Sequence, residues 1–242
     1  MTFGVFRATV AGFMQRDEAV FELGTVDLLT RAINQARRWA ERKRNFELCR
    51  VQTKLTAVNL QDGASLSTAV LASDGVTTVN IKSIAKAFLP FSNGSGMFPV
   101  DVISRDAHVR RLQKRYENIQ AADPTTRVPP IPSTVSYFTV VRTADKLYVT
   151  PADATVFGAT TVDVYLDAFK WLPEYMCDAD TDFFLDYCED WLLFRSVYQL
   201  NMMLKEDVRV PISREALVEA WQSVIEWDTN LVQNYMEDAN LD

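Results

Sequence analysis

The sequence predicts an α+β protein, a helical bundle of terminal helices with an inserted small antiparallel β-sheet. Near the start of the chain and in two segments near its end, apolar residues recur every three or four positions, the period of an amphipathic helix. In the middle of the chain the period falls toward two, as in strands. We therefore expect one domain over residues 1–242, with a helical core at about residues 20–46 and 174–236 and a β-rich insertion at about residues 47–172.

The first helix is expected at about residues 26–44. Thr25 is the expected N-cap, and Asp27 stands where the helix dipole favours an acid. The apolar positions share one face, and arginines at positions 31, 38 and 42 occupy the other, which makes the helix basic and amphipathic. The apolar face comprises Val26, Leu29, Ile33, Ala36 and Ala40.

Alternation of apolar and polar residues predicts the strands. It is present at residues 51–57 and 78–82, and residues 135–141 and 146–150 flank a Thr-Ala-Asp turn, as in a hairpin. The clearest strand is 162–166, where valine and leucine alternate with aspartate and tyrosine. These segments predict an antiparallel sheet.

One helix is expected to interrupt the sheet, with Ser104 as its N-cap and its end near Ile119. Two linkers flank it, a Gly- and Ser-rich one at residues 92–96 and a Pro-rich one at residues 123–133. Loops this long in a compact domain are often functional or disordered. In a subunit that assembles with other copies, they would be candidates to become ordered only on assembly.

Two helices are expected to close the chain. Residues 182–205 are apolar on most sides, which predicts a helix that its neighbours cover. Residues 214–235 follow Ser213 as N-cap, with Ile212 and Leu217 at the spacing of a hydrophobic staple. The expected core face of this last helix is Leu217, Trp221, Val224, Ile225, Leu231 and Tyr235.

Charge is distributed unevenly along the chain, although the net charge of −7 disfavours nucleic-acid binding through overall basicity. Residues 31–54 and 105–115 are basic, whereas residues 178–190 hold six acids and no base. Separated charges suit self-association or docking, and solvated helix faces are the alternative. The candidate interface residues are Arg37, Arg38, Arg42, Arg44, Arg110, Arg111, Asp178, Asp180 and Asp182.

No catalytic constellation is evident. His108 is the only histidine, and the neighbouring Arg110 and Arg111 disfavour the imidazolium that acid–base or nucleophilic catalysis would need. Residues 83–86 fit the SxxK pattern of serine acyltransferases, but the accompanying SDN and KTG elements are absent. We expect no catalytic residues, no enzymatic activity and no cofactor.

The acidic segment has part of the pattern of a metal site. Asp178, Asp180, Asp182 and Glu189 stand at the first, third, fifth and twelfth places of an EF-hand loop, but the sixth place holds Phe183 instead of glycine. An acidic cluster at a helix N-terminus is favourable without a metal. The three cysteines form no CxxC pair, and their odd number argues against a disulfide framework. No metal is expected, and a reducing cytoplasm is the expected setting.

The order of these elements resembles that of the head-to-tail connector (adaptor) proteins of tailed phages. The similarity covers most of the chain and is one of pattern. It begins with the helix TVDLLTRAINQARRWAER at residues 25–42 and continues with KLYVTP at 146–151 and VDVYL at 162–166. Leu172-Pro173, a long aromatic helix, a break near residues 206–209 and a final helix with Trp221 and Trp227 follow.

The resemblance implies a virion structural protein without catalytic residues. It implies a homo-oligomeric ring, commonly of twelve subunits, that docks on the portal protein and joins the capsid to tail or tail-nozzle proteins. Genomic DNA would pass through the lumen without specific binding. The protein would occupy the neck of the virion after assembly in the host cytoplasm. Separated charges fit the head-to-tail contacts of such a ring. The candidate arginines would meet an acidic surface on a neighbour or on the portal.

Two rival functions are also compatible with the sequence. A nucleic-acid-binding module that uses the basic helices would bind DNA with steep salt dependence. A hydrolase would have to use the carboxylates of residues 178–190. The first residues lack the basic and apolar regions of a signal peptide, and no stretch reaches 18 apolar residues, so no membrane association is expected.

Overall fold

The computed structural model describes residues 1–23, 26–91, 96–110, 113, 139–143, 145–150, 157–204 and 212–238. The chain divides into two compact units. The helical unit comprises residues 1–48 and 172–242, and the sheet unit comprises residues 49–171.

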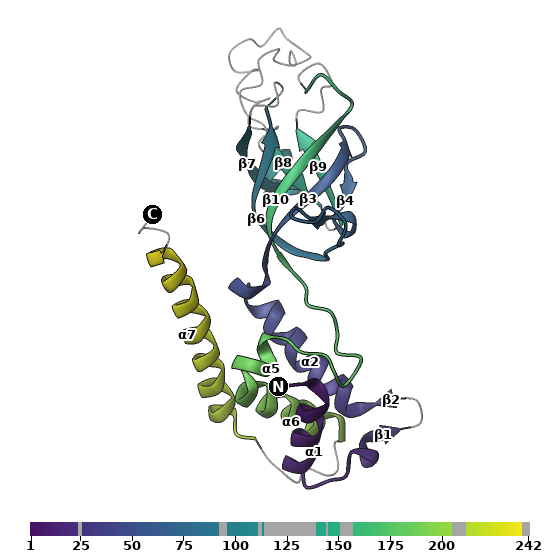
Figure 1. Ribbon diagram of the computed structural model, residues 1–242, viewed down its shortest axis with the longest axis vertical. Helices are drawn as coiled ribbons and strands as arrows, with labels where there is room; N and C mark the ends of the chain where they lie inside the picture. Colours follow the sequence, from purple (N-terminus) through teal and green to yellow (C-terminus); the bar gives the residue numbers. More distant parts are fainter. Residues whose placement is uncertain are drawn as a thin grey trace. The chain divides into compact units, whose positions relative to one another are not determined.

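The sheet unit is built on a curled eight-stranded sheet (Figure 1). Its order is β4-β9-β8-β7-β6-β10-β3-β5, and every neighbouring pair is antiparallel except β7 and β8, which are parallel. The strands are β3 (Arg50–Asn59), β4 (Ala64–Ser65), β5 (Val70–Leu71), β6 (Ile81–Pro90), β7 (Met97–Ser104), β8 (Thr139–Arg142), β9 (Lys146–Thr150) and β10 (Thr161–Lys170).

The expected fold class, a helical bundle with a small antiparallel inserted sheet, is therefore wrong. The sheet has eight strands, is mixed, and curls around a core of its own. Two features hid this from the sequence. β4 and β5 have only two residues each, too few for alternation to be visible, and the parallel pairing of β7 with β8 depends on a crossover between distant segments.

The concave side of the sheet is filled by branched aliphatic side chains. In β10, residues at even positions from Val162 to Ala168 are buried and the odd positions between them are half-buried, which confirms the strand expected at 162–166. The expected hairpin is confirmed for β8 and β9, and residues 135–138 lie outside the described residues. The main core side chains are Leu55, Val58, Leu60, Ile81, Leu89, Val140, Leu147, Val149, Val164 and Leu166.

The helical unit contains helices from both ends of the chain (Figure 1). Short elements connect these helices, including the two-stranded ladder of β1 and β2. The elements are α1 (Phe3–Phe13), η1 (Glu18–Phe21), β1 (Glu22–Leu23), β2 (Val26–Asp27), α2 (Leu28–Lys43), η2 (Glu47–Cys49), α5 (Phe183–Tyr187), α6 (Glu189–Leu204) and α7 (Arg214–Asp238). A third 3-10 turn, η3 (Leu66–Thr68), belongs to the sheet unit.

The basic amphipathic helix is confirmed as α2, although its cap is Asp27 and not Thr25. The Asp27 carboxylate accepts hydrogen bonds from the backbone N–H of Thr30 at 3.0 Å and from its hydroxyl at 2.5 Å. The helix starts later than expected because β2 takes the residues before Leu28 into its ladder. The face toward α6 buries Leu29, Ala32, Ile33, Ala36 and Ala40.

Aromatic rings form the centre of the helical unit. The buried Trp191 of α6 lies with its ring centroid 6.0 Å from that of Trp39 on α2 and 5.1 Å from that of Trp221 on α7. Phe46, which follows α2, packs edge-on against Phe184 at 5.1 Å. Rings from separate segments therefore share one core, which contributes strongly because each buries a large apolar area.

The two closing helices differ in part from expectation. The helix expected at 182–205 is broken at Cys188 into α5 and α6, with Asp182 as N-cap of α5. α7 begins as expected, since the Ser213 hydroxyl accepts a hydrogen bond from the backbone N–H of Ala216 at 3.0 Å. Its expected core face is incomplete: Val224 is buried, and the half-buried members are Leu217, Trp221, Ile225 and Leu231. The side chain of Tyr235 lies outside the described part of α7.

The helix expected within the sheet unit begins at Arg105. The Ser104 hydroxyl accepts a hydrogen bond from the backbone N–H of Ala107 at 3.2 Å, which confirms the cap. Residues 105–110 are helical, and nearly all of the expected remainder to Ile119 lies outside the described residues. The Pro-rich linker and most of the Gly- and Ser-rich linker lie outside them as well.

Gly4 allows α1 to approach the loop before α5. Its backbone N–H donates to the Asp178 carbonyl at 3.0 Å, and a Cβ at this position would lie 2.7 Å from the Asp178 Cβ. We expect Gly4→Ala to lower the free energy of unfolding by about 1–3 kcal/mol, because a backbone must shift to relieve the clash. Denaturant titration checks this value.

Gly12, near the end of the same helix, is the matched control. No heavy atom lies within 4 Å of a Cβ placed there, so Gly12→Ala should stabilise the protein by about 0.5–1 kcal/mol. Equal effects of the two substitutions would contradict the close approach at Gly4.

Candidate functional site

A buried ion pair joins α2 to the segment that leads into α5. Arg37 is 1% exposed, and its Nη1 donates to the Asp182 carboxylate at 2.8 Å. The same carboxylate accepts from the Tyr175 hydroxyl at 2.5 Å and caps α5 through the Phe184 N–H at 3.0 Å. Burial, and then the adjacent Asp182 charge, raise the pKa of Tyr175 far above its usual value, so this hydroxyl remains a donor.

This centre fixes the path of residues 172–182. Arg37 also donates to the Pro173 carbonyl and lies over the Tyr175 ring at 4.0 Å. Asn34 adds two hydrogen bonds to the Tyr175 backbone, at 2.9 and 3.1 Å. One face of α2 therefore serves as a polar template for the chain that returns from the sheet unit.

Glu41 extends the template by one turn. It is 1% exposed, accepts from the Leu172 N–H at 2.8 Å, and pairs with Arg38 at 2.8 Å. Arg38 lies 3.8 Å from Glu174 as well. The charges of Arg37 and Arg38, two of the candidate interface residues, are thus used inside the helical unit.

A second buried carboxylate anchors α7. Asp228 is 1% exposed and accepts from Arg44 Nε at 2.6 Å and from the Glu47 backbone N–H at 2.9 Å. Arg44 donates to the Thr229 hydroxyl at 3.0 Å. Arg44, a further interface candidate, therefore links the end of α2 to α7.

The remaining basic candidates are differently placed. Arg42 on α2 and Arg110 in the sheet unit are exposed, and Arg111 lies outside the described residues. Arg31, which is not among the candidate interface residues, is exposed on the same side of α2 as Arg42. The signal that could have identified it is its position opposite the apolar face of the helix.

The three acidic candidates are held by separate partners. Asp178 is exposed and 3.5 Å from Arg7, and Asp182 belongs to the buried centre. Asp180 accepts from the backbone N–H groups of Met176 and Cys177 at 2.6 and 2.9 Å. Because each carboxylate is directed at its own donors, they do not form the ring of ligands that an EF-hand presents. Among the described residues, no group of three or more His, Cys, Asp or Glu side chains is arranged to hold a metal ion.

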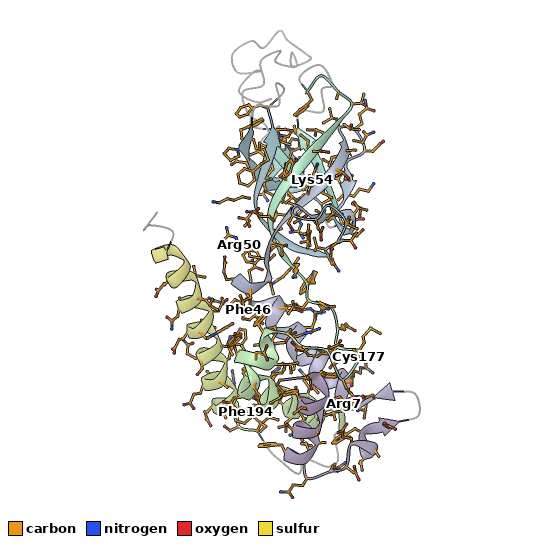
Figure 2. The ribbon with its side chains drawn as sticks, in the orientation of Figure 1. Arg7, Phe46, Arg50, Lys54, Cys177 and Phe194 are labelled. Carbon is orange, nitrogen blue, oxygen red and sulfur yellow. The ribbon has the colours of Figure 1, made fainter. Side chains whose placement is uncertain are left out.

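Cys177 is exposed but poorly activated (Figure 2). Its thiol donates to the Asp180 carboxylate at 2.8 Å, and this hydrogen bond raises the thiol pKa and contributes to lowering that of Asp180 to about 2. We expect slow labelling of Cys177 by a thiol reagent at pH 7, and faster labelling in Asp180→Asn.

Asp178→Asn is the control for that experiment, since Asp178 makes no hydrogen bond to the thiol in the described structure. A labelling rate that is the same in wild type and Asp180→Asn would contradict the contact. Cys49 and Cys188 are buried, and burial raises the pKa of Cys188 to about 12, so Cys177 should account for the labelling.

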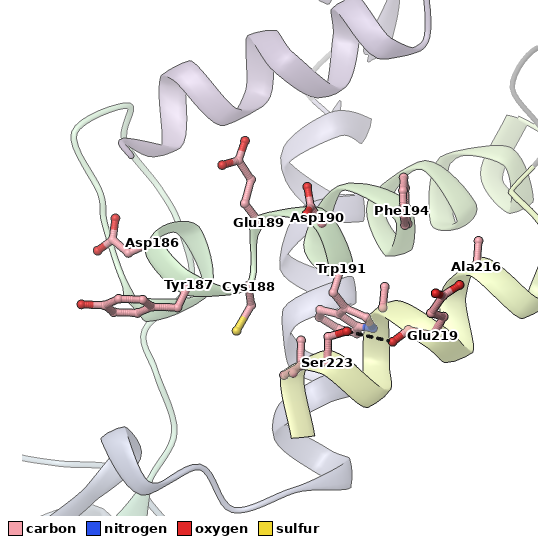
Figure 3. Close-up of a pocket in the computed structure, with 12 residues that line it drawn as sticks. Asp186, Tyr187, Cys188, Glu189, Asp190, Trp191, Phe194, Ala216, Glu219 and Ser223 are labelled. Atoms are coloured by element: carbon pink, nitrogen blue, oxygen red, sulfur yellow. Dashed lines mark hydrogen bonds between the residues drawn. The ribbon is translucent and has the colours of Figure 1, made fainter. Parts of the chain in front are cut away.

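A groove of about 540 Å³ lies between the α5–α6 turn and α7 (Figure 3). Trp191, Phe194 and Ala216 are among the apolar residues that line it. Asp186, Glu189 and Asp190 line it on the α5–α6 side, where the Glu189 side chain is directed away from α7, and Glu219 lines it on the α7 side. The groove thus combines an apolar lining with acidic residues at its edges, which suits a cationic and amphipathic partner better than a small anionic substrate.

His108 adds no catalytic group to this arrangement. It is half-buried in the helix that follows Ser104, within the sheet unit, whereas the groove belongs to the helical unit. The hydrolase hypothesis would need paired carboxylates with displaced pKa values.

Comparison with known proteins found no protein family that matches the chain and no curated protein that matches it. None of the helices within the described residues combines the length and the hydrophobicity of a membrane-spanning segment.

Proposed function

We propose that this chain is a virion structural protein: a subunit of the ring that docks on the portal and joins a phage capsid to its tail. The observation that supports this proposal most directly is the incomplete burial of α7. This 25-residue helix has several large apolar side chains that are half-buried, and Val218 is 60% exposed. Apolar surface of this kind is typical of a protein that associates.

The charge distribution supports the same proposal. The helical unit carries a basic exposed face on α2 and an acidic groove beside α7. Two different and complementary faces on one subunit suit head-to-tail contacts, which close into rings when the rotation allows. The resemblance in the order of elements adds the portal and tail as partners.

Ion pairs that three arginines form within the helical unit weigh against the nucleic-acid-binding alternative. Arg37, Arg38 and Arg44 pair with Asp182, Glu41 and Asp228, so their charges are largely neutralised. The overall charge of −7 acts in the same direction. DNA binding by the isolated subunit that weakens steeply with salt would favour the alternative.

The test is to incubate the purified protein with the portal protein from the same genome and to image the product by electron microscopy. We expect a ring of additional density on one end of the portal. Arg42→Glu should reduce docking, because Arg42 is exposed, whereas the conservative control Arg42→Lys should not. Unaltered portal rings in the presence of excess wild-type protein would refute the proposal.

A further inference from the structure

We propose that the groove between α6 and α7 is the site that receives the exposed basic stripe of α2 from a second copy of this chain. The inference rests on the proposed ring and names the surfaces that join its neighbours. The groove is the one whose lining includes Trp191, Phe194 and the four acidic residues. The stripe consists of the exposed residues Arg31, Gln35 and Arg42.

The groove presents negative charge that the subunit itself leaves available. Glu189, Asp190 and Glu219 form no ion pair with any described residue, and the Asp186 carboxylate pairs with the N-terminal ammonium at 2.5 Å. Carboxylates around an apolar lining repel one another, and they are stabilised when a cationic surface covers them.

The stripe presents positive charge on the opposite side of α2 from its core contacts. Its members stand four and seven residues apart, so they lie in one row along the helix. Arg31 and Arg42 are exposed and form no ion pair with another described residue, and the rise of a helix places them about 16 Å apart.

The two surfaces belong to different faces of one unit. The buried face of α2 packs on α6, and Trp39 on its flank contacts Trp221 of α7, so the stripe is directed away from the α6–α7 groove of its own subunit. A subunit cannot fill its own groove in this way. Contact between the groove of one copy and the stripe of the next is therefore heterologous, as a ring requires.

Charge exchange tests the contact in the full-length protein. One variant carries Glu189→Lys, Asp190→Lys and Glu219→Lys in the groove, and the other carries Arg31→Glu and Arg42→Glu in the stripe. Self-association is measured by sedimentation up to about millimolar concentration, and circular dichroism verifies folding. We expect wild type to associate in a salt-sensitive manner and each variant alone to associate at least about tenfold more weakly.

An equimolar mixture of the two variants should recover association, because each Lys-bearing groove then meets a Glu-bearing stripe and each native groove meets a native stripe. Both variants remain net negative, since the protein starts at −7, so bulk attraction cannot produce this recovery. A control with Asp17→Lys, Asp62→Lys and Asp106→Lys, all at exposed positions, should associate like wild type.

A wild type that stays monomeric throughout, variants that associate normally, or a mixture that fails to recover would each overturn the inference. The portal experiment reports separately on the proposed function. A ring on the portal together with a monomeric free subunit would retain the function and remove this contact.

Discussion

Asp182→Ala is expected to lower the free energy of unfolding of the helical unit by about 3–5 kcal/mol, the largest effect that we predict for a single substitution. The substitution leaves Arg37, which is 1% exposed, without its carboxylate. It also removes the acceptor of the Tyr175 hydroxyl and the N-cap of α5. Chemical denaturation followed by tryptophan fluorescence measures the loss, since four of the five tryptophans lie in the helical unit.

A double-mutant cycle separates the ion pair from the cap. Arg37→Met alone removes the buried charge, and the double variant should lose much less than the sum of the two single losses, because neither charge is left uncompensated. Asp178→Ala is the control, since that carboxylate is exposed and its pairing with Arg7 at 3.5 Å should contribute little. Additive losses in the cycle would contradict the coupling of Arg37 with Asp182.

Asp228→Ala should loosen α7 from the rest of the helical unit and cost about 2–4 kcal/mol. The backbone N–H of Glu47 would lose its acceptor, and Arg44 would lose the carboxylate that orients it. The effect should be smaller than at Asp182 because the Arg44 side chain is 29% exposed and water can solvate it. Hydrogen exchange along α7 should accelerate more than exchange along α6.

Thr229→Ala is the matched control for Asp228. It removes two exposed hydrogen bonds of the Thr229 hydroxyl, the one from Arg44 at 3.0 Å and the one to the Ile225 carbonyl at 2.7 Å, so a change below about 1 kcal/mol is expected. Exchange rates in α7 that are unchanged by Asp228→Ala would show that the aromatic contacts of Trp221 hold the helix without help from the carboxylate.

Local patterns predict the helices better than the sheet. The apolar spacing of α2 and the Ser213 cap of α7 are local features, and the structure confirms both. The break at Cys188 was not predicted, because a segment that is apolar on most sides gives no signal where its path turns. The strand number was missed because a two-residue strand is defined by its partner and not by its own sequence.

The candidate site illustrates the same limit. Counting charges along the sequence identifies the basic and acidic segments. Whether a charged side chain forms an ion pair within the subunit or stays exposed on its surface depends on tertiary contacts. Arg37 and Asp182 are 145 residues apart in the chain and meet in the core, whereas Arg31 and Glu219 face outward. Helical spacing does separate Arg31 from Arg37, since only the former lies opposite the apolar face, but it does not show that Arg37 is paired in the core.

The division of the helical unit between the two ends of the chain has a consequence for biosynthesis. On the ribosome, the sheet unit emerges complete before α5, α6 and α7 emerge, so it can fold while α1 and α2 still lack the partners that cover their apolar faces. The apolar faces of those two helices therefore stay open to aggregation until Asp182 and Asp228 have emerged and can pair with Arg37 and Arg44.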